Sequence, residues 1–510
     1  MDSPHHEFTY FKPTAASDIV AAWERTAHLI RERKAPKNIT LYVHWPYCVS
    51  QCTFCFCDMQ VPRSAGAFSQ YAAMLKREMD LFRAPLRGIQ FSRVWFGGGT
   101  PTFMPDGELN DLLNHLRSCF SIAPKAEIYF EAAPSTLTTS KLAILIKHGL
   151  NHITMGVQTL DKELLTQLDR RGQTSVGVGR IYRMLQDHPR VITDFDLMVG
   201  LEGQTEDSFL KDFVRLLALR PGMVHIYPFD PRPGTLSFQS GTVAQDRLYD
   251  KLRILSRTVS AVARRFGYQT ALMYQDIGDD LNRDVEPVVL ELQNRSLQGF
   301  GESVLGLGYS AISHAFGSCQ YQHQRVGQDP LNTDGVPPFL SMPMDRLDEM
   351  HGYIVRNLTR YGAFYPAAFH EFFGEDVLNI PSIRTQLLNL RASGQLEISD
   401  KRIWLPTRDL MERLVLVKHF YSSSLKRTLI RANRENYQRF LYNCAKAGDQ
   451  ISEEVADRIL SRSLLMLCTR NDLVGGRSAW DDTATNGTVS SETINGGPVI
   501  SLRDDIRNSP

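Results

Sequence analysis

The sequence predicts an α/β fold: an incomplete (β/α)6 barrel with a C-terminal winged-helix-like and helical region. Between residues 39 and 235, six short apolar or β-branched runs alternate with amphipathic stretches, which is the pattern of β/α units around a parallel sheet. Six runs favour an open barrel over a closed barrel of eight strands. The length of 510 residues also exceeds the size at which one core usually stops growing, so several domains are expected.

An N-terminal extension, residues 1–38, precedes the barrel and carries a helix expected over residues 19–33. The six strands follow as TLYVHW (40–45), RVWFGG (93–98), EIYFEAA (127–133), HITMGV (152–157), TDFDLMVGL (193–201) and MVHIYPF (223–229). A long amphipathic helix is expected over residues 244–266. The Gly-rich run 299–313 then predicts a further strand and a tight loop at the barrel edge, which completes a core domain over residues 39–330.

The C-terminal part divides into three regions. Residues 340–410 show helical periodicity and end in QLLNLRASGQLEISDKRIWLP, which predicts a helix, a two-stranded wing and hence a winged-helix-like domain. A basic recognition helix is missing from it, which favours a lid or packing module over DNA binding. Residues 411–474 form a helical region, and residues 475–510, rich in Gly, Ser, Thr, Asn and Asp, are expected to be a disordered tail.

Charge and hydropathy argue against two classes of partner. The chain carries 57 basic and 56 acidic residues, a net charge of +1, which gives no reason to expect binding to nucleic acid or to an anionic membrane. No apolar run approaches the roughly 20 residues needed to cross a bilayer, and the polar start MDSPHHEF lacks the pattern of a signal peptide. A cytoplasmic location is therefore expected.

Four of the eight cysteines fall within ten residues, which favours metal binding over a disulfide framework. The spacing of Cys48, Cys52 and Cys55, directly after the first strand, suits three ligands of a [4Fe–4S] cluster whose fourth iron stays open. A zinc knuckle is the alternative, with Cys57 as the required fourth ligand. In an extended loop Cys55 and Cys57 are expected to point apart. The other cysteines are isolated and expected to be buried small hydrophobes: Cys119, Cys319, Cys444 and Cys468.

The segment from Tyr42 to Cys57, YVHWPYCVSQCTFCFC, closely resembles the cluster motif of the radical S-adenosylmethionine (SAM) superfamily. It is most similar to the oxygen-independent coproporphyrinogen III oxidase group, whose members share the extra cysteine at the position of Cys57. The resemblance extends over about residues 39–325. It implies a radical SAM barrel and a [4Fe–4S] cluster held by Cys48, Cys52 and Cys55, with Cys57 not a ligand. The amino and carboxylate groups of SAM would chelate the open iron.

The resemblance also implies contacts with this SAM molecule. Glycines after the second strand let the backbone approach a ligand closely and offer N–H groups to it. In the resembling family this loop contacts the SAM amino group, which assigns Gly98, Gly99 and Thr100 of GGGTPT to SAM. Tyr42 and the strand-end Glu131 are assigned to the same molecule, and Ile312 in GLGYSAIS would pack against it.

Four further residues match positions that bind a second SAM in that family: Phe54, Gln158, Arg170 and Asp196. Considered one at a time, Gln158 would be an ordinary strand-end amide, Arg170 a helix-surface arginine and Asp196 a strand-end carboxylate. Their joint match implies two SAM molecules. Asp230 falls near another such position but differs from the small residue expected there.

Three histidines invite acid–base roles. His44 and His225 are expected to be strand residues with satisfied hydrogen bonds, whereas His314 borders the site, and both a structural and a functional role stay open for it.

Two reactions fit a two-SAM site, and both start with reductive cleavage of SAM to a 5′-deoxyadenosyl radical that takes a hydrogen atom. We expect methylene transfer from the second SAM to an sp² carbon of a natural product, by C-methylation or cyclopropanation. Two features favour it: the N-terminal FTYFKPTA only partly matches the oxidases, and the chain carries an extended helical region with a polar tail. The alternative is oxidative decarboxylation of a coproporphyrinogen propionate to a vinyl group.

A third hypothesis is a non-catalytic haem chaperone, a group that also resembles this family. Those proteins typically lack the second cysteine of the Cys-x-Cys pair, so Cys57 argues against it. The expected partners are a small-molecule or carrier-bound substrate and a reductant such as flavodoxin or ferredoxin. The sequence of the loops that would select the substrate does not indicate which substrate binds.

Overall fold

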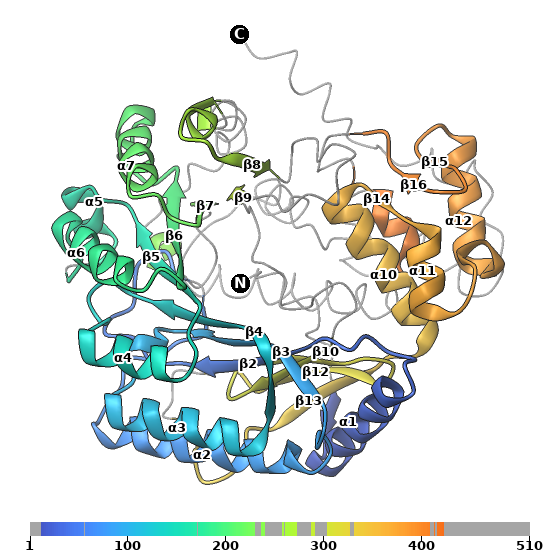
Figure 1. The fold of residues 1–510 in the computed structure, drawn as a ribbon, viewed down its shortest axis with the longest axis horizontal. Helices are drawn as coiled ribbons and strands as arrows, with labels where there is room; N and C mark the ends of the chain where they lie inside the picture. Colours follow the sequence, from blue (N-terminus) through green and yellow to red (C-terminus); the bar gives the residue numbers. More distant parts are fainter. Residues whose placement is uncertain are drawn as a thin grey trace. The chain divides into compact units, whose positions relative to one another are not determined.

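The computed structural model describes residues 12–55, 57–170, 172–229, 236–239, 258–259, 261–272, 287–290, 303–326, 331–407, 413 and 416–422 (Figure 1). One compact unit comprises residues 1–6 and 11–420 and contains nearly all of them. The second unit, residues 7–10 and 421–510, is described only at Tyr421 and Ser422. The predicted tail and nearly all of the predicted helical region therefore lie outside the described residues, as does Asp230.

Six parallel strands form the barrel sheet and lie side by side in chain order. They are β2 (Ile39–Trp45), β3 (Gln90–Gly98), β4 (Ser121–Ala132), β5 (His152–Gln158), β6 (Ile192–Val199) and β7 (Met223–Pro228). The connecting helices are α2 (Gly66–Arg83), α3 (Asp106–Cys119), α4 (Thr139–Lys147), α5 (Lys162–Gln167), α6 (Ser175–Gln186) and α7 (Glu206–Ala218). The prediction of six β/α strands is confirmed.

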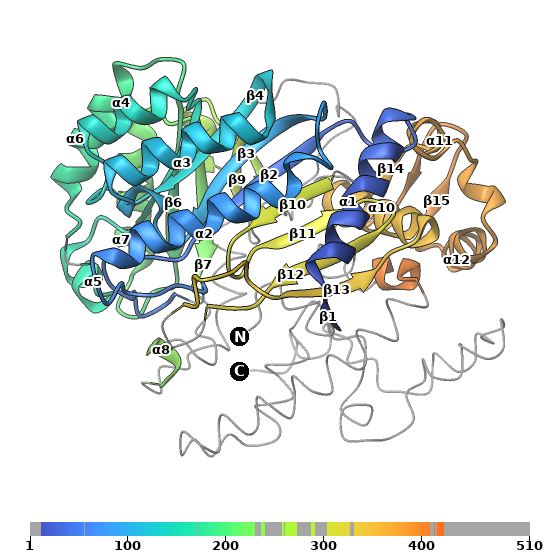
Figure 2. The same ribbon diagram turned by 90° about the horizontal axis from the view of Figure 1, so that it is seen from below.

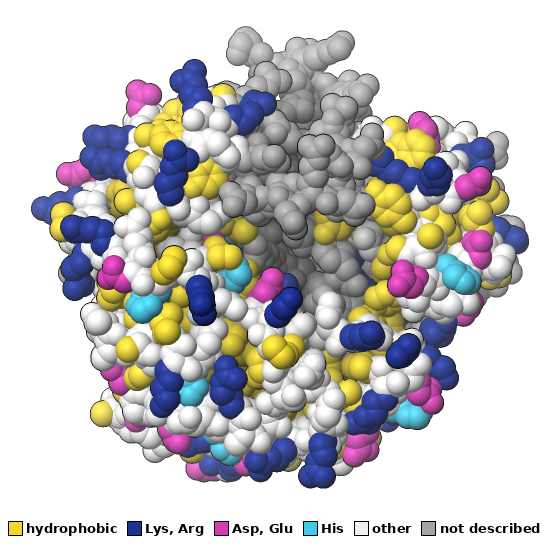
Figure 3. Space-filling view, viewed as in Figure 1, with side chains coloured by type: hydrophobic (Ala, Val, Ile, Leu, Met, Phe, Trp, Pro, Cys, Tyr) yellow, Lys and Arg dark blue, Asp and Glu magenta, His cyan; other side chains and the backbone are white. Residues whose placement is uncertain are grey.

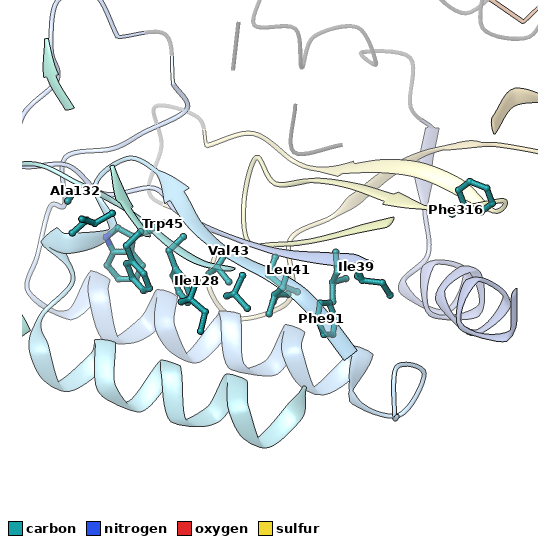
Figure 4. Close-up of a cluster of buried hydrophobic side chains, with 14 of the residues drawn as sticks. Ile39, Leu41, Val43, Trp45, Phe91, Ile128, Ala132 and Phe316 are labelled. Carbon is teal, nitrogen blue, oxygen red and sulfur yellow. The ribbon is translucent and has the colours of Figure 1, made fainter. Parts of the chain in front are cut away.

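Alternation along β2 separates a core face from a site face. Leu41, Val43 and Trp45 are fully buried, and Figure 4 shows them between the strands and the helices that cover the sheet. The two residues between them, Tyr42 and His44, therefore face the opposite side of the sheet. Their neighbours on β3 and β4 continue that side, since Trp95 stacks on Tyr129 at 5.0 Å between ring centroids.

The sheet continues beyond β2, which the sequence predicted only in part. Strand β10 (Ser303–Leu307) pairs in parallel with β2 and confirms the edge strand expected from the Gly-rich run. The strands β11 (Ile312–Ala315), β12 (Cys319–His323), β13 (Phe339–Pro343) and β1 (Lys12–Thr14) then follow in antiparallel pairing. Helix α1 (Ala16–Arg31) packs on this extension, where Trp23 Nε1 donates to Tyr321 Oη at 2.8 Å (Figure 2).

After the sheet, the chain forms a helix–strand–helix–helix–strand–strand order, which is typical of winged helices. The elements are α10 (Arg346–Tyr361), β14 (Ala363–Phe364), α11 (Pro366–Phe373), α12 (Pro381–Ala392), β15 (Glu397–Ile398) and β16 (Ile403–Trp404). The three strands pair in the order β14-β16-β15, so the predicted hairpin after α12 is present.

The segment between β7 and β10 is described only in pieces. They include α8 (Leu236–Gln239) and a small parallel sheet of β8 (Gln269–Leu272) with β9 (Pro287–Leu290). Most of the helix predicted over residues 244–266 lies outside the described residues. Among those described, no helix is long and apolar enough to cross a membrane. Basic and acidic side chains are intermingled over the described part of the face in Figure 3.

Candidate active site

The cysteine loop leaves the carboxyl end of β2 and folds back on itself. Gln60 N donates to Pro46 O at 2.7 Å, and Cys48 N donates to Gln60 O at 3.0 Å. The far side of the loop is tied to the segment after α5, because Thr53 N donates to Leu168 O at 3.3 Å. Carboxyl ends of parallel strands are where ligands bind in barrels of this kind.

The three predicted ligand thiols lie close enough to affect one another. Cys48 Sγ is 3.2 Å from Thr100 Oγ1, and Arg170 Nη1 donates to Cys52 Sγ at 3.6 Å. The pKa of Cys48 is raised to about 12, mainly by burial; the neighbouring Cys55 and Cys52 also raise it, whereas Thr100 and Arg170 lower it. Burial also raises the pKa of Cys52, so these two thiols are held as neutral groups until a cation compensates their charge.

Cys57 lies beside Cys55 rather than away from it, so the expectation that the two side chains point apart is wrong. The Cys57 thiol is hydrogen-bonded to Cys55, and this contact is the main cause of a lowered pKa at Cys55. The loop turns here instead of continuing as an extended strand, so strand alternation does not apply. Cys57 is the exposed member of the four, while the other three are partly buried.

This donor set fits an iron–sulfur cluster with one open coordination position. Three soft thiols converge from one short loop, as cysteine-ligated clusters require. Arg170 supplies a positive charge beside them that offsets the negative charge of thiolates. The glycine loop next to these cysteines lies so close to its neighbours that its glycines leave no room for side chains.

The glycines of the β3–α3 loop let this loop lie on the cysteine loop. Gly98 has φ +106°, and a Cβ on it would meet the His44 ring at 2.6 Å; one on Gly99 would meet the backbone of Pro46 at 2.9 Å. Gly99 N donates to Trp45 O at 2.7 Å, and Thr100 N donates to Tyr47 O at 3.0 Å. The expectation that these glycines offer free N–H groups is therefore wrong for Gly99, because the N–H is already bonded within the protein.

Tyr42 and His44 form a hydrogen-bonded chain that ends on the cysteine loop. Tyr42 Oη lies 3.0 Å from His44 Nδ1, and His44 Nε2 donates to Asp58 O at 3.0 Å. Since Asp58 O can only accept, His44 carries its proton on Nε2 and accepts from Tyr42. Burial lowers the pKa of His44, which agrees with a neutral ring. His44 is thus a satisfied strand histidine, as predicted.

Glu131 is a partly buried carboxylate held by two N–H donors rather than a solvated strand end. Trp95 Nε1 donates to Glu131 Oε1 at 2.9 Å, and the backbone N–H of Gly98 also donates to this carboxylate. Burial raises the pKa of Glu131 to about 7, although both hydrogen bonds lower it. The role of Trp95 was missed from the sequence, where it reads as one more apolar strand residue.

The residues matched to a second ligand meet around Gly156. Arg170 Nη2 donates to Gly156 O, and a Cβ on Gly156 would lie 3.0 Å from Gln158 Nε2. Asp196 pairs with Gly156 in the sheet register. Gln158 itself has φ +67°, a strained conformation for a residue other than glycine, next to a register shift in β5.

Apolar side chains cover two sides of these groups. Phe54 packs with Leu164, Leu168, Met198 and Leu201. On the β10 side, Tyr42 lies in a small apolar cluster with Val304, Ala311 and Trp95, and the partly buried Ile312 begins the next strand. Most of the predicted site residues thus lie at the carboxyl ends of strands or in the loops that follow them. Tyr42 and Asp196 lie within β2 and β6, Arg170 follows α5, and Ile312 begins β11.

The other histidines have structural partners. His314 Nε2 is 2.7 Å from Glu349 Oε1 with both side chains fully buried, which ties β11 to α10. His225 Nδ1 lies 3.4 Å from Tyr227 Oη on the same strand. Cys319 is buried as predicted, but Cys119 is not isolated: it is partly exposed and contacts Asp80.

Comparison with known proteins supports one family. The model of the radical SAM superfamily matches residues 42–216. The oxygen-independent coproporphyrinogen III oxidase of Escherichia coli is 32% identical over 309 residues, which cover 58% of this chain and 65% of that protein. The Salmonella typhimurium enzyme of the same name is 31% identical over 395 residues, covering 73% and 82%. The chain thus spans just under two thirds of the Escherichia coli relative.

A solved structure shows the same fold. It is coproporphyrinogen III oxidase from Escherichia coli, which is described as a radical SAM enzyme. It aligns with a TM-score of 0.64 and 23% identity over 81% of this chain and 97% of that chain.

The expectation of methylene transfer, and with it the classification as a transferase, is wrong. The sequence relatives and the solved structure are all named coproporphyrinogen III oxidase. The chain belongs to the oxygen-independent coproporphyrinogen III oxidase group of the radical SAM superfamily.

Proposed function

We propose that this protein catalyses the oxidative decarboxylation of coproporphyrinogen III, converting propionate side chains to vinyl groups. The observation that carries the proposal is the alignment with the Salmonella typhimurium oxidase at 31% identity over 82% of that enzyme. The aligned barrel holds three converging thiols beside a glycine loop and a partly buried carboxylate. For each propionate, the 5′-deoxyadenosyl radical takes one hydrogen atom, and one further electron passes to an external one-electron acceptor as carbon dioxide is released, so the side chain is oxidised by two electrons.

Membership of the superfamily implies a [4Fe–4S] cluster and SAM, and the residues present fit them. Cys48, Cys52 and Cys55 would hold the cluster, which when bound supplies the electron that cleaves SAM to the radical that takes the substrate hydrogen. The protein's own task is to hold these groups in place and to keep water away.

The chain of hydrogen bonds around His44 performs the first part of that task. Asp58 lies in the cysteine loop, so the bond from His44 Nε2 to Asp58 O fixes this loop on β2. Glu131, fixed by Trp95 and Gly98, presents a carboxylate for the ammonium or ribose hydroxyls of SAM. Apolar surface from Tyr42, Val304 and Ala311 bounds the same region.

The groups around Gly156 support a second SAM molecule in the same site. Gln158 supplies an amide, Arg170 a guanidinium and Asp196 a carboxylate, and together they suit the amino-acid and ribose parts of SAM. Phe54 adds an apolar wall. Because Arg170 also contacts Cys52, a molecule bound there would lie next to the cluster loop.

The proposed partners follow from the electron balance. Cleavage of SAM needs an electron from outside the chain, so we expect a low-potential carrier such as flavodoxin or ferredoxin. The substrate is a small molecule.

The test is an anaerobic assay of the iron-loaded protein with dithionite, SAM and coproporphyrinogen III. We expect carbon dioxide release and vinyl product together with 5′-deoxyadenosine. With methyl-deuterated SAM, the 5′-deoxyadenosine should carry no deuterium. The Cys48→Ala variant should be inactive, and Cys319→Ala, at a buried position outside the site, should keep activity. Formation of 5′-deoxyadenosine without any decarboxylation would contradict the proposal.

A further inference from the structure

A group of three side chains with metal-binding chemistry lies on the outer helices, away from the cysteine loop. Asp80 comes from α2, and His115 and Cys119 come from α3, which runs beside α2 in Figures 1 and 2. Their ligand atoms, a carboxylate oxygen, an imidazole nitrogen and a sulfur, all lie within 4.8 Å of one another. His115 and Cys119 are four residues apart, so they share one helix face.

The contacts within this group already point to a common centre. His115 Nε2 lies 3.2 Å from Asp80 Oδ1, and Cys119 Sγ donates to the same oxygen at 3.5 Å. Both ligands thus contact one carboxylate oxygen. A divalent cation would displace the thiol proton of Cys119, bind a ring nitrogen of neutral His115 and be coordinated by all three side chains at once.

The ligand set selects the class of metal. Imidazole, thiolate and carboxylate are the three groups that bind Zn²⁺ in proteins, and a fourth tetrahedral position can be left to solvent. Magnesium and calcium prefer oxygen ligands, so a site with one sulfur and one nitrogen disfavours them.

The surroundings supply both favourable and unfavourable charge. Asp80 lies in the last turn of α2 and Cys119 is the last residue of α3, so two helix carboxyl ends, each with negative partial charge, converge here. Arg83 opposes a cation, but its Nη2 is bonded to Ser118 O at 2.9 Å. The Asp80 and His115 side chains are 50% and 26% exposed, so an ion from solvent can reach them.

The position also separates this group from the proposed catalytic site. In a β/α unit a helix carboxyl end lies near the amino end of the following strand. The cysteine loop lies at the carboxyl end of β2, so the two places are at opposite ends of the barrel strands.

We propose that Asp80, His115 and Cys119 form a surface site for a divalent transition-metal ion of the zinc class. The ion would cross-link the ends of α2 and α3 and stabilise this side of the barrel.

The test uses the full chain, purified anaerobically with its iron loaded so that the cluster cysteines are occupied. Equilibrium dialysis against Zn²⁺ should show one bound zinc in addition to the iron. The zinc K-edge absorption spectrum, which iron does not obscure, should show one sulfur ligand among nitrogen and oxygen. Zinc should also raise the melting temperature.

Variants at partly exposed positions keep the fold and sharpen the result. His115→Ala and Cys119→Ala should each weaken zinc binding at least tenfold and remove the rise in melting temperature. His28→Ala, on an exposed surface of α1, is the matched control and should bind zinc as the unaltered protein does. Unchanged zinc affinity in Cys119→Ala, or a spectrum without sulfur, would overturn the proposal. Coproporphyrinogen oxidation should be the same in all three variants. A result that contradicts the zinc site therefore leaves the proposed function standing, and the reverse also holds.

Discussion

His323 and Glu78 form a fully buried hydrogen-bonded pair that joins the antiparallel extension of the sheet to helix α2, with Nε2 2.5 Å from Oε1. The second oxygen of Glu78 accepts from Gly308 N at 2.8 Å. From there the network reaches the site, because Tyr309 N donates to Tyr71 Oη at 3.0 Å and Tyr71 Oη donates to His44 O at 3.0 Å. The pair therefore supports the strand that carries Tyr42 and His44.

Removal of one partner from this pair should destabilise the protein strongly. Glu78→Gln or His323→Gln leaves an uncompensated polar group in the core, and we expect a loss of about 3–5 kcal/mol in the free energy of unfolding. Denaturant titration measures it. Glu32→Gln, in an exposed salt bridge on the surface, should cause little change. Equal effects for the buried and exposed variants would show that the pair does not support the fold.

The cysteine variants test the ligand assignment. Cys48→Ala, Cys52→Ala and Cys55→Ala should each lose the brown colour and the iron, about four atoms per chain in a [4Fe–4S] protein. Cys57→Ala should keep both, although its contact with Cys55 is lost. Iron analysis after anaerobic reconstitution gives the answer. A Cys57 variant without iron would mean that Cys57 is a ligand.

Gly98→Ala should damage the site through His44. The new methyl group meets the His44 ring at 2.6 Å in a backbone conformation with φ +106°, so His44 must move and its bond to Asp58 O is strained. We expect lower iron content and weaker SAM binding, measured by iron analysis and equilibrium dialysis. Gly107→Ala is the control, since the space around Gly107 in α3 is open. Normal iron content and SAM binding in Gly98→Ala would show that the close approach is not required.

SAM binding should depend on pH near neutrality through Glu131. Its pKa of about 7 means that the carboxylate is ionised above pH 7 and takes up a proton below it. Because the ionised form binds an ammonium or ribose hydroxyl better, affinity for SAM should fall as the pH decreases from 8 to 6, approaching tenfold per pH unit at the acid end. Equilibrium dialysis of the iron-loaded protein measures this. Glu131→Gln should bind SAM more weakly at pH 8 and lose this dependence. The same slope in the variant would assign the titration to another group.

The features that could be predicted from the sequence alone are local. The runs that became β2 to β7 follow from alternation of apolar residues within a few positions, and the spacing of Cys48, Cys52 and Cys55 places three thiols on one short loop. These patterns do not depend on how distant segments pair, so the six barrel strands and the cysteine loop were predictable without the structure.

Contacts between side chains that are distant in the sequence could be found only in the folded structure. Glu78 and His323 are separated by 245 positions, and Asp80 and Cys119 by 39, so no local pattern relates the members of either pair. The N–H of Gly99 is satisfied by Trp45 because parallel pairing sets β2 beside β3 in one register. Hydrogen bonds and ion pairs act over a few ångströms, and the packing of whole elements determines which groups come that close.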